Sequence, residues 1–286
     1  MKTSTEIYSL AKHVGEERAI ELLARAGFDA YDFSMFLMCR LDSNQSLAEN
    51  SHPLAGADYL KFARQLRRTA EACGIECNQS HAPFPVSNPH IRSHLKRAIE
   101  CTAEAGGRIC IIHPDNNKSA EENAELYFEL LPFAKEHKVK IATENMWNWN
   151  KEEDHASAAA CSHHIDFLRH IEAVNDEYLV ACLDVGHSEM AGLDTSSVEM
   201  IKTLGSHLQA LHLHDNDLRR DLHQLPFSQK IDFAPIVAAL KQIGYSGYFT
   251  LEADNFLGAF TAESLSEGVS LLYQSCRKLC DMYENS

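Results

Sequence analysis

A helix, a glycine and a strand follow one another repeatedly along this chain. Apolar residues recur at helical spacing through 16–26, Gly27 interrupts the pattern, and the strand-like segment 28–33 follows. The same unit returns at 58–80 and at 91–113. Helix-like segments also precede four later strand-like segments, which are 140–145, 179–184, 208–215 and 247–252. With a first strand at 3–8 and a last helix at 263–283, the sequence predicts eight strands, each followed by a helix.

This alternation favours a single (β/α)₈ TIM barrel, an α/β fold, as one domain over residues 1–286. The segment 109–112 is apolar without alternation, which is typical of parallel strands that are covered on both faces. A doubly wound sheet would use the same elements, but the sequence contains neither a G-x-G-x-x-G nor a Walker loop. No linker or low-complexity stretch divides the chain, so we expect one domain.

Composition narrows the classes of function. The chain has 41 acidic and 26 basic residues, and its net charge of −15 disfavours nucleic acid as a partner. No apolar run approaches the roughly 18 residues of a membrane span, and residues 1–10 lack the apolar run of a signal peptide. The nine cysteines include no C-x-x-C pair. We therefore expect a cytoplasmic protein with reduced cysteines and no membrane contact.

Every predicted strand from the third to the eighth ends in an imidazole or a carboxylate. These residues are His81, His113, Glu144, Asp184 with His187, His212 with His214, and Glu252. Because all strand ends of a barrel converge on one face, we expect these side chains to meet in space. Carboxylates and neutral imidazoles together bind divalent metals, whereas carboxylates clustered alone would repel one another and partly protonate. The sequence therefore predicts a metal site at the strand ends.

A structural explanation competes at each position, because a single Asp or Glu after a strand commonly caps a helix or lies in a solvated loop. Six consecutive strand ends make coincidence a poor explanation for the whole set. Of His212 and His214, we expect one to face away from the barrel interior, and we assign the metal to His212. Ten other histidines lie at helix or loop positions and receive no functional assignment: His13, His52, His90, His94, His137, His155, His163, His164, His170 and His207.

The motifs around these residues resemble the sugar phosphate isomerase/epimerase family of xylose isomerase-like TIM barrels, a superfamily that also contains endonuclease IV. They run in order from about residue 75 to 255 and are Ser-His81-Ala-Pro-Phe, Ile-Ile-His113-Pro, Glu144-Asn, Leu-Asp184-Val-Gly-His187, Leu-His212-Leu-His-Asp-Asn, Asp221-Leu-His223, Ile-Gly-Tyr-Ser-Gly and Leu-Glu252. The resemblance implies the barrel fold and a carbohydrate substrate. Dimers and tetramers are common among these relatives, so a homo-oligomer is left open.

The resemblance also implies a metal-dependent isomerase or epimerase. In the ketose 3-epimerases one divalent ion is held by Glu, Asp, His and Glu, which correspond here to Glu144, Asp184, His212 and Glu252. Such a mixed oxygen and nitrogen set selects weakly among Mn²⁺, Zn²⁺, Co²⁺ and Mg²⁺. A metal that bridges two substrate oxygens acidifies the C–H bond between them and stabilises the enediolate. Glu144 and Glu252 are the implied acid and base of the proton transfer.

Seven further residues are candidates for substrate binding: His81, His113, His187, Trp147, Arg219, Asp221 and His223. By resemblance His187 would bind a substrate hydroxyl or carbonyl. Arg219 or Arg220, which follow the metal histidine, are candidates to hold a terminal hydroxyl, carboxylate or phosphate, and solvated loop charges are the alternative for both. The two tryptophans of the chain, Trp147 and Trp149, follow Glu144 closely, and a sugar stacks its C–H face on such rings. Asn150 stands where ketose 3-epimerases carry a substrate-binding glutamate, so the substrate is expected to differ from a simple ketohexose.

Two other activities fit the same residues. Endonuclease IV binds three zinc ions through nine ligands, and all nine have a counterpart here: His81, His113, Glu144, Asp184, His187, His212, Asp221, His223 and Glu252. However, the Ala-Gly-Gln-Gly run of that enzyme is missing, and the loops offer no basic cluster with intercalating aromatic residues. A lyase or dehydratase acting on a sugar derivative through the same enediolate is the other alternative. The isomerase or epimerase is favoured over both.

Overall fold

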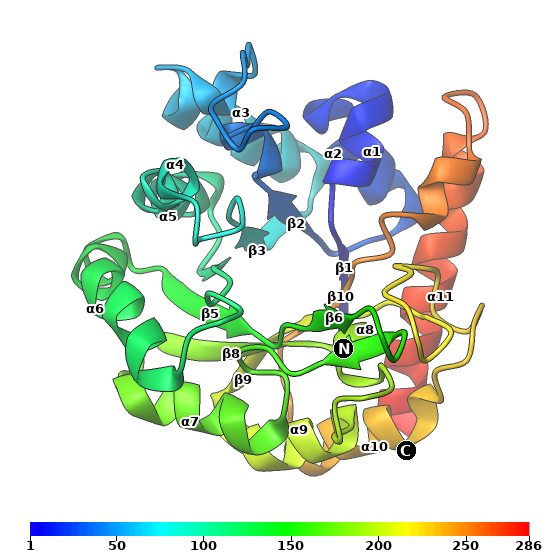
Figure 1. The fold of residues 1–286 in the computed structure, drawn as a ribbon. Coiled ribbons are helices and arrows are strands. Elements are labelled where there is room, and N and C mark those ends of the chain that lie inside the picture. The colour runs from blue at the N-terminus through cyan, green and yellow to red at the C-terminus, as the bar shows by residue number, and fades with distance from the viewer. Residues whose placement is uncertain (286) are drawn as a thin grey trace.

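The computed structural model of the chain describes residues 1–285 and shows a barrel of parallel strands enclosed by helices (Figure 1). Its eight strands, named with their bounds, are β1 (Lys2–Thr5), β2 (Ala30–Ser34), β3 (Glu76–His81), β4 (Ile109–Ile111), β5 (Lys140–Glu144), β8 (Leu179–Asp184), β9 (Leu208–His212) and β10 (Tyr248–Leu251). A small antiparallel hairpin of β6 (Asn148–Asn150) and β7 (His155–Ser157) follows β5.

The barrel closes through two isolated bridges. Strands β2, β3, β4, β5, β8 and β9 form one parallel sheet, and β1 pairs in parallel with β10. The Glu6–Asp32 bridge joins β1 to β2, and the Leu213–Leu251 bridge joins β9 to β10. Each strand therefore has a neighbour on both sides, which removes open sheet edges. The predicted (β/α)₈ barrel is confirmed.

Helices connect successive strands on the outside of the barrel. They are α1 (Tyr8–Val14), α2 (Glu16–Ala26), α3 (Tyr59–Cys73), α4 (Pro89–Arg92), α5 (Leu95–Ala105), α6 (Ala120–His137), α7 (His164–Val174), α8 (Val185–Ser188), α9 (Ser197–Leu204), α10 (Phe233–Gln242) and α11 (Leu265–Asn285). The glycines that the sequence places between helix and strand act as helix caps: Gly27 and Gly106 have φ of 107° and 90°, a left-handed conformation that favours glycine.

The core has two parts. A small interior cluster fills the barrel between the strands and consists of Ile111, Ala142, Val180, Cys182 and Ala210. A much larger cluster lies between the strands and the surrounding helices and includes the fully buried Tyr31, Phe33 and Phe167. Residues two apart on each strand point to the same side, so Glu144 follows Ala142, and Asp184 follows Cys182, on the interior face. The interior cluster therefore forms a floor beneath the residues at the strand ends.

Two segments differ from the sequence prediction. The first strand ends at Thr5, and Tyr8 already begins α1, because the carboxylate of Glu6 accepts a hydrogen bond from the backbone N–H of Ser9 and turns the chain. The segment after β5 contains the hairpin β6–β7, which hydrophobic periodicity did not indicate. Both differences lie at the end of the barrel where the strands finish.

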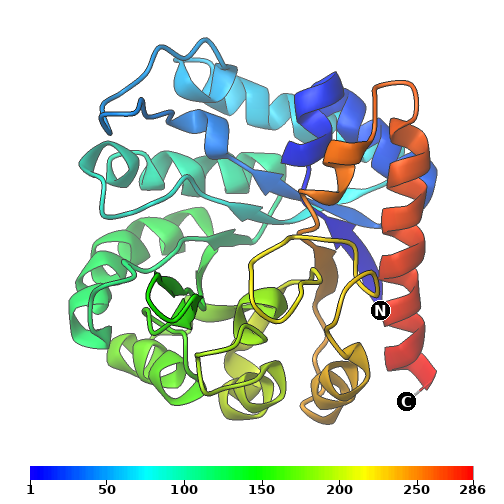
Figure 2. The same cartoon turned by 45° about the vertical axis from the view of Figure 1, so that its right-hand side comes forward.

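The chain ends meet on one side of the barrel. Figure 2 shows α11 running alongside the barrel, where it packs against β1 and β10. The N-terminal ammonium group of Met1 pairs with the carboxylate of Glu284. All nine cysteines are free thiols. Within residues 1–285, no helix has the length and apolar character needed to cross a membrane.

Candidate metal centre and active site

Four residues from four neighbouring strands meet at the centre of the barrel mouth. Glu144, Asp184 and His212 are the last residues of β5, β8 and β9, and Glu252 directly follows β10. Each offers one ligand atom, and these four atoms lie within 4.8 Å of one another. None of the four residues is more than 9% exposed. We call this set the central cluster.

Glu144 of the central cluster contacts three histidines. Its Oε1 lies 3.0 Å from Nδ1 of His212, and its Oε2 lies 3.1 Å from Nε2 of His113 and 3.6 Å from Nε2 of His81. Oε2 of Glu252 is 3.3 Å from the same Nδ1. Nδ1 of His212 is therefore close to both of the glutamates that the sequence proposed as acid and base.

Asp184 is fixed by the backbone around it. Its Oδ1 accepts a hydrogen bond of 2.7 Å from the N–H of His187, which caps the short helix α8. Asn145 joins β5 to β8, because its side chain bonds both the N–H and the C=O of Asp184 at 2.8 Å. The second oxygen, Oδ2, is buried and has no hydrogen-bond partner within the described chain. A buried carboxylate oxygen without a donor is costly and well suited to a cation.

The charged groups of the central cluster and its neighbours shift one another's pKa values. Burial tends to raise the pKa of Glu144, but His212 and His113 outweigh it and hold that pKa well below its usual range. Burial raises the pKa of Glu252 well above its usual range, with Glu144 and Asp184 adding to the effect. One glutamate thus favours the ionised form while the other favours a proton. A divalent cation would replace that proton and satisfy both carboxylates.

A second group of four residues lies beside the central cluster. Oδ2 of Asp221 is 3.2 Å from Nε2 of His187 and 3.0 Å from Nε2 of His223, and its Oδ1 is 3.5 Å from Nε2 of His214. We call this set the outer cluster. Burial tends to lower the pKa of His187, but Asp184 and Asp221 outweigh it and raise that pKa to about 10. As in the central cluster, histidines and a carboxylate here share protons that a metal could displace.

The position of His214 corrects the sequence prediction. His214 is fully buried and faces the barrel interior together with His212, with its Nε2 3.1 Å from Oδ1 of Asp184. The expectation that one of the two would face away is wrong, because residues two apart on an extended chain point to the same side. Gly186 makes the room: a Cβ there would lie 1.8 Å from the His214 ring.

The central and outer clusters open into a pocket of about 370 Å³. Its aromatic and apolar lining includes Phe36, Phe84, Met146 and Trp147, and its acidic lining includes Glu144, Asp221, Glu252 and Asp254. His81 and His113 also line it, and burial followed by the nearby His81 lowers the pKa of His113 to about 4, so this ring is neutral. Among the described residues, no lysine or arginine lines this pocket. Trp149 packs instead against a small apolar cluster with Met190.

Arg219 lies outside the pocket, unlike the other predicted substrate-binding residues. Its guanidinium pairs with the carboxylate of Asp154, and its Nε donates a 2.9 Å hydrogen bond to the Asp154 carbonyl. Both side chains are 49% exposed. The structure therefore joins the loop after β9 to the hairpin β6–β7 through Arg219 and does not bring this residue to the substrate side.

Two buried acidic residues, one within β2 and one directly after β1, were not predicted from the sequence. Asp32 lies in β2 and is fully buried, with Oδ2 3.1 Å from Nε2 of His212. Glu6 follows β1, and burial, with a smaller contribution from Asp254, raises its pKa to about 7. The rule that found the later positions, a carboxylate or an imidazole in the last two residues of a strand, would have found Asp32 in the predicted strand 28–33. It would not have found Glu6, which lies before the last two residues of the predicted strand 3–8.

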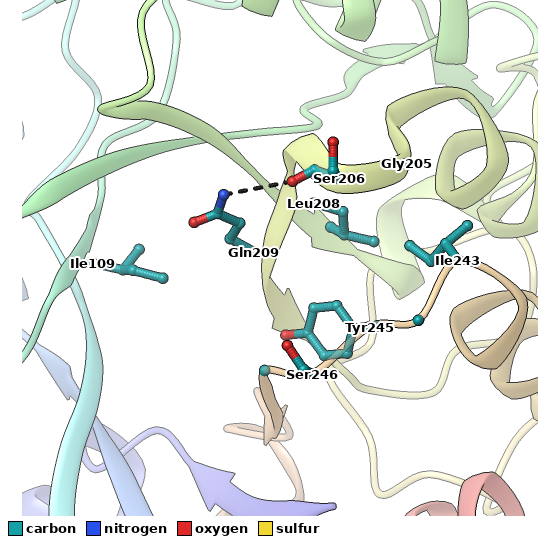
Figure 3. Close-up of a pocket in the computed structure, with 10 residues that line it drawn as sticks. Ile109, Gly205, Ser206, Leu208, Gln209, Ile243, Tyr245 and Ser246 are labelled. Atoms are coloured by element: carbon teal, nitrogen blue, oxygen red, sulfur yellow. Dashed lines mark hydrogen bonds between the residues drawn. The ribbon is translucent and has the colours of Figure 1, made fainter.

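A second pocket of about 390 Å³ lies at the opposite end of the barrel (Figure 3). This pocket lies where β4, β9 and β10 begin. Its lining includes Ile109, Leu208, Gln209 and Tyr245. Figure 3 shows the amide of Gln209 directed toward Ser206, to whose carbonyl it donates a 3.5 Å hydrogen bond. Its lining contains no histidine, carboxylate, lysine or arginine among residues 1–285.

Comparisons with known proteins agree with this architecture. A model of the xylose isomerase-like TIM barrel family matches residues 20–274, and the chain belongs to that family. An uncharacterised protein of Methanocaldococcus jannaschii, MJ1311, is 23% identical over 265 residues, which span 86% of this chain and 82% of that protein.

Solved structures of similar fold include sugar enzymes. The crystal structure of a D-tagatose 3-epimerase-like protein matches with a TM-score of 0.70 and 20% identity over 98% of this chain and 99% of that chain. The crystal structure of the IOLI protein with a bound zinc atom matches with a TM-score of 0.69 and 18% identity over 100% of this chain and 99% of that chain. At these sequence identities, the structural similarity establishes the fold alone.

Proposed function

We propose that this protein is a divalent-metal-dependent isomerase or epimerase of an uncharged sugar or sugar derivative. One observation supports this most strongly: Glu144 and Glu252 both line the pocket, and both hold a carboxylate oxygen next to Nδ1 of His212, at 3.0 and 3.3 Å. Two carboxylates that face the same pocket and lie near the same atom allow a proton to be removed by one and returned by the other. The sugar epimerases of similar fold support the same reaction class.

The central cluster fits a metal by its donor set. Three carboxylates and an imidazole suit Mn²⁺, Zn²⁺, Co²⁺ or Mg²⁺, and the unpartnered Oδ2 of Asp184 supplies a free ligand atom. When bound, the ion would polarise a substrate carbonyl and acidify the adjacent C–H bond. Zinc in the IOLI structure is consistent with this assignment.

Residues of the pocket transfer the proton, hold Glu144 in place and contact the substrate. Glu144 and Glu252 exchange the proton with substrate carbon. The neutral ring of His113 lies at hydrogen-bond distance from Glu144, 3.1 Å between Nε2 and Oε2, and donation from this nitrogen holds that carboxylate in place. Trp147, together with Phe36 and Phe84, offers an apolar surface for the C–H face of a sugar. His187 and Asp221 offer polar groups to its hydroxyls.

The lining of the pocket supports an uncharged substrate. It includes four carboxylates and no cationic lysine or arginine among the described residues. Arg219, which could have held a phosphate, pairs with Asp154. A phosphorylated sugar or a sugar acid would therefore find no guanidinium or ammonium partner in this lining.

A deuterium-exchange screen tests the proposal. Purified protein is incubated in D₂O with neutral keto sugars, inososes or 3-keto-glycosides, with or without added Mn²⁺ or Zn²⁺, and products are analysed by NMR and mass spectrometry. We expect deuterium in a neutral sugar product, only when metal is present. Phosphorylated sugars and sugar acids serve as the contrasting panel. Exchange without metal, or turnover restricted to anionic sugars, would contradict the proposal. A product that has lost water or an aglycone would identify a lyase or dehydratase.

A second candidate is a trinuclear zinc phosphodiesterase of the endonuclease IV type. The observation in its favour is that all nine corresponding residues fall in three adjoining groups, which are the central cluster, the outer cluster, and His81 with His113 and Glu144. His214 of the outer cluster is the one member of these groups that has no counterpart among the nine. Metal analysis of protein purified without chelators separates the two candidates. About one divalent ion per chain supports the isomerase, whereas close to three zinc ions with cleavage of abasic DNA would favour the phosphodiesterase.

A further inference from the structure

His212 presents a different ring nitrogen to the clusters than three other histidines of the site do. In His81, His187 and His223, Nδ1 lies 2.8 Å from a backbone carbonyl oxygen, which fixes the proton on Nδ1 and leaves Nε2 facing the clusters. In His212, Nδ1 faces Glu144 and Glu252, and Nε2 points away from them. The partner of that Nε2 is a carboxylate, Oδ2 of Asp32, at 3.1 Å.

Asp32 is itself held rigidly inside the barrel. Nε2 of Gln79 donates a 2.8 Å hydrogen bond to the same Oδ2 of Asp32. The other end of that amide accepts hydrogen bonds from Asn78 at 3.2 Å and Thr250 at 3.4 Å, so its orientation is determined. Asp32 and Gln79 are fully or almost fully buried.

An irregularity in the sheet places Asp32 opposite Gln79. The pairing of β2 with β3 shifts by one residue between Tyr31 and Asp32, so that Tyr31 pairs with Cys77 and Asp32 with Gln79. A β-bulge of this kind redirects a side chain, and bulges are frequent beside active sites. Without the shift, Asp32 would pair with Asn78, the residue before Gln79. The network from Thr250 through Gln79 and Asp32 to His212 therefore depends on this local register.

The chemistry of imidazole explains how the contact with Asp32 would affect metal binding by His212. A neutral imidazole binds a metal through the lone pair of one nitrogen while the other nitrogen carries the proton. An acceptor at Nε2 keeps the proton there and leaves the lone pair on Nδ1, and a carboxylate acceptor also increases the basicity of the ligand. For His212, Nδ1 is the nitrogen that belongs to the central cluster.

We propose that Asp32 is a positioning residue for the metal site: it holds His212 with the proton on Nε2 and presents Nδ1 to the cation. The inference rests on the metal site of the proposed function and adds a residue of β2 to it. Asp32 does not line the substrate pocket, so its effect passes through His212.

Zinc binding by Asp32→Asn tests the inference without reference to activity. Zinc affinity of full-length wild type and variant is measured by competition with a chromophoric chelator. We expect a ten- to hundredfold weaker affinity in Asp32→Asn, the range known for groups that support a metal ligand. In ¹⁵N-labelled wild type loaded with zinc, the His212 ring is expected to show a protonated Nε2 and a metal-bound Nδ1. The matched control is Asp29→Asn, directly before β2, where Oδ2 of Asp29 accepts a hydrogen bond from the backbone N–H of Thr3; it should bind zinc as wild type does.

The outcomes separate three possibilities. Wild-type zinc affinity in Asp32→Asn, even with a lowered melting temperature, would show a structural role only and overturn the inference while sparing the metal site. No zinc binding by the wild type would overturn the metal site and, with it, this inference. If Asp32→Asn does not fold, Gln79→Met removes the donor that holds Asp32. Weakened zinc binding is then expected, and unchanged affinity there would overturn the inference.

Discussion

The two ends of the barrel carry pockets of similar volume that differ in the ionisable residues of their linings. The pocket at the carboxyl ends of the strands has about 370 Å³, and that at the amino ends has about 390 Å³. The first is lined by four histidines and four carboxylates, whereas the second is lined by backbone, glycine, aliphatic, serine and Gln209 side chains with one tyrosine. The size of a cavity therefore does not identify the active site. The direction of the strands does, because their carboxyl ends feed the long loops of one face.

Residues at the amino end serve packing. The hydroxyl of Tyr245 donates a 3.1 Å hydrogen bond to the carbonyl of Tyr248, and a Cβ at Gly247 would lie 2.4 Å from that hydroxyl oxygen. Gln209 accepts a hydrogen bond of 2.9 Å from Lys140 of β5. These contacts tie the beginnings of β9 and β10 to their neighbours. The same strands present His212 and Glu252 at their other ends.

Among the substitutions that compare the two ends of the barrel, Glu252→Gln at the carboxyl end is expected to have the largest effect, which is a loss of turnover. This change keeps the shape of the side chain but removes the carboxylate that would exchange a proton with the substrate and bind the metal. General acid or base catalysis contributes about 10²- to 10⁴-fold, so we expect turnover to fall by about a thousandfold or more. Steady-state kinetics and deuterium exchange measure the loss, and circular dichroism verifies the fold. A variant that keeps more than a tenth of wild-type turnover would remove Glu252 from this role.

A pH-dependent effect on stability is expected for Glu6, also at the carboxyl end. Burial raises its pKa from 4.5 to about 7, so the folded state keeps a proton that the unfolded state loses. Stability from this group is therefore present below pH 4.5 and is lost as the pH rises to 7. The stability of Glu6→Gln relative to wild type should grow by about 3 kcal/mol between pH 4.5 and pH 8, at about 1.4 kcal/mol per pKa unit. Urea unfolding at both pH values measures it, and a constant difference would contradict the shift.

The smallest effect is expected for Gln209→Ala at the amino end. The variant loses the hydrogen bond with Lys140, which is partly exposed, so a stability loss of about 1 kcal/mol is expected. Zinc affinity and turnover should remain within about twofold of wild type. Comparison with Glu252→Gln in the same assays tests the contrast between the two ends. A large loss of turnover in Gln209→Ala would show that the pocket in Figure 3 takes part in function.

Much of the fold and of the candidate site was predictable because barrel geometry converts sequence order into position. Helical periodicity indicated the alternation of helices and strands, with a glycine marking the first three joints, and parallel strands must end on one face. His81, Glu144, Asp184, His212 and Glu252 could thus be grouped before any coordinates were known, although they are far apart in the sequence. The outer-cluster residues Asp221 and His223 follow β9 in a loop, and their grouping came from the resemblance to the family.

Other features depended on contacts that periodicity does not encode. Arg219 follows the metal histidine in sequence but pairs with Asp154 of the distant hairpin β6–β7. Asp32 reaches His212 through a shift in the pairing of β2 with β3, and a shift between Ala181 and Cys182 similarly sets Asp184 opposite His212. The closeness of His214 to Asp184 depends on the space left by Gly186.

The sequence by itself determined the order of strands and helices and the kinds of side chain at the barrel mouth, because both follow from local periodicity and from the direction of the chain. The tertiary structure decided which nitrogen of His212 faces the glutamates, which carboxylate stands behind it, and which arginine turns away. Those choices depend on register, bulges and long-range hydrogen bonds, where a displacement of one residue changes the partner of every side chain involved.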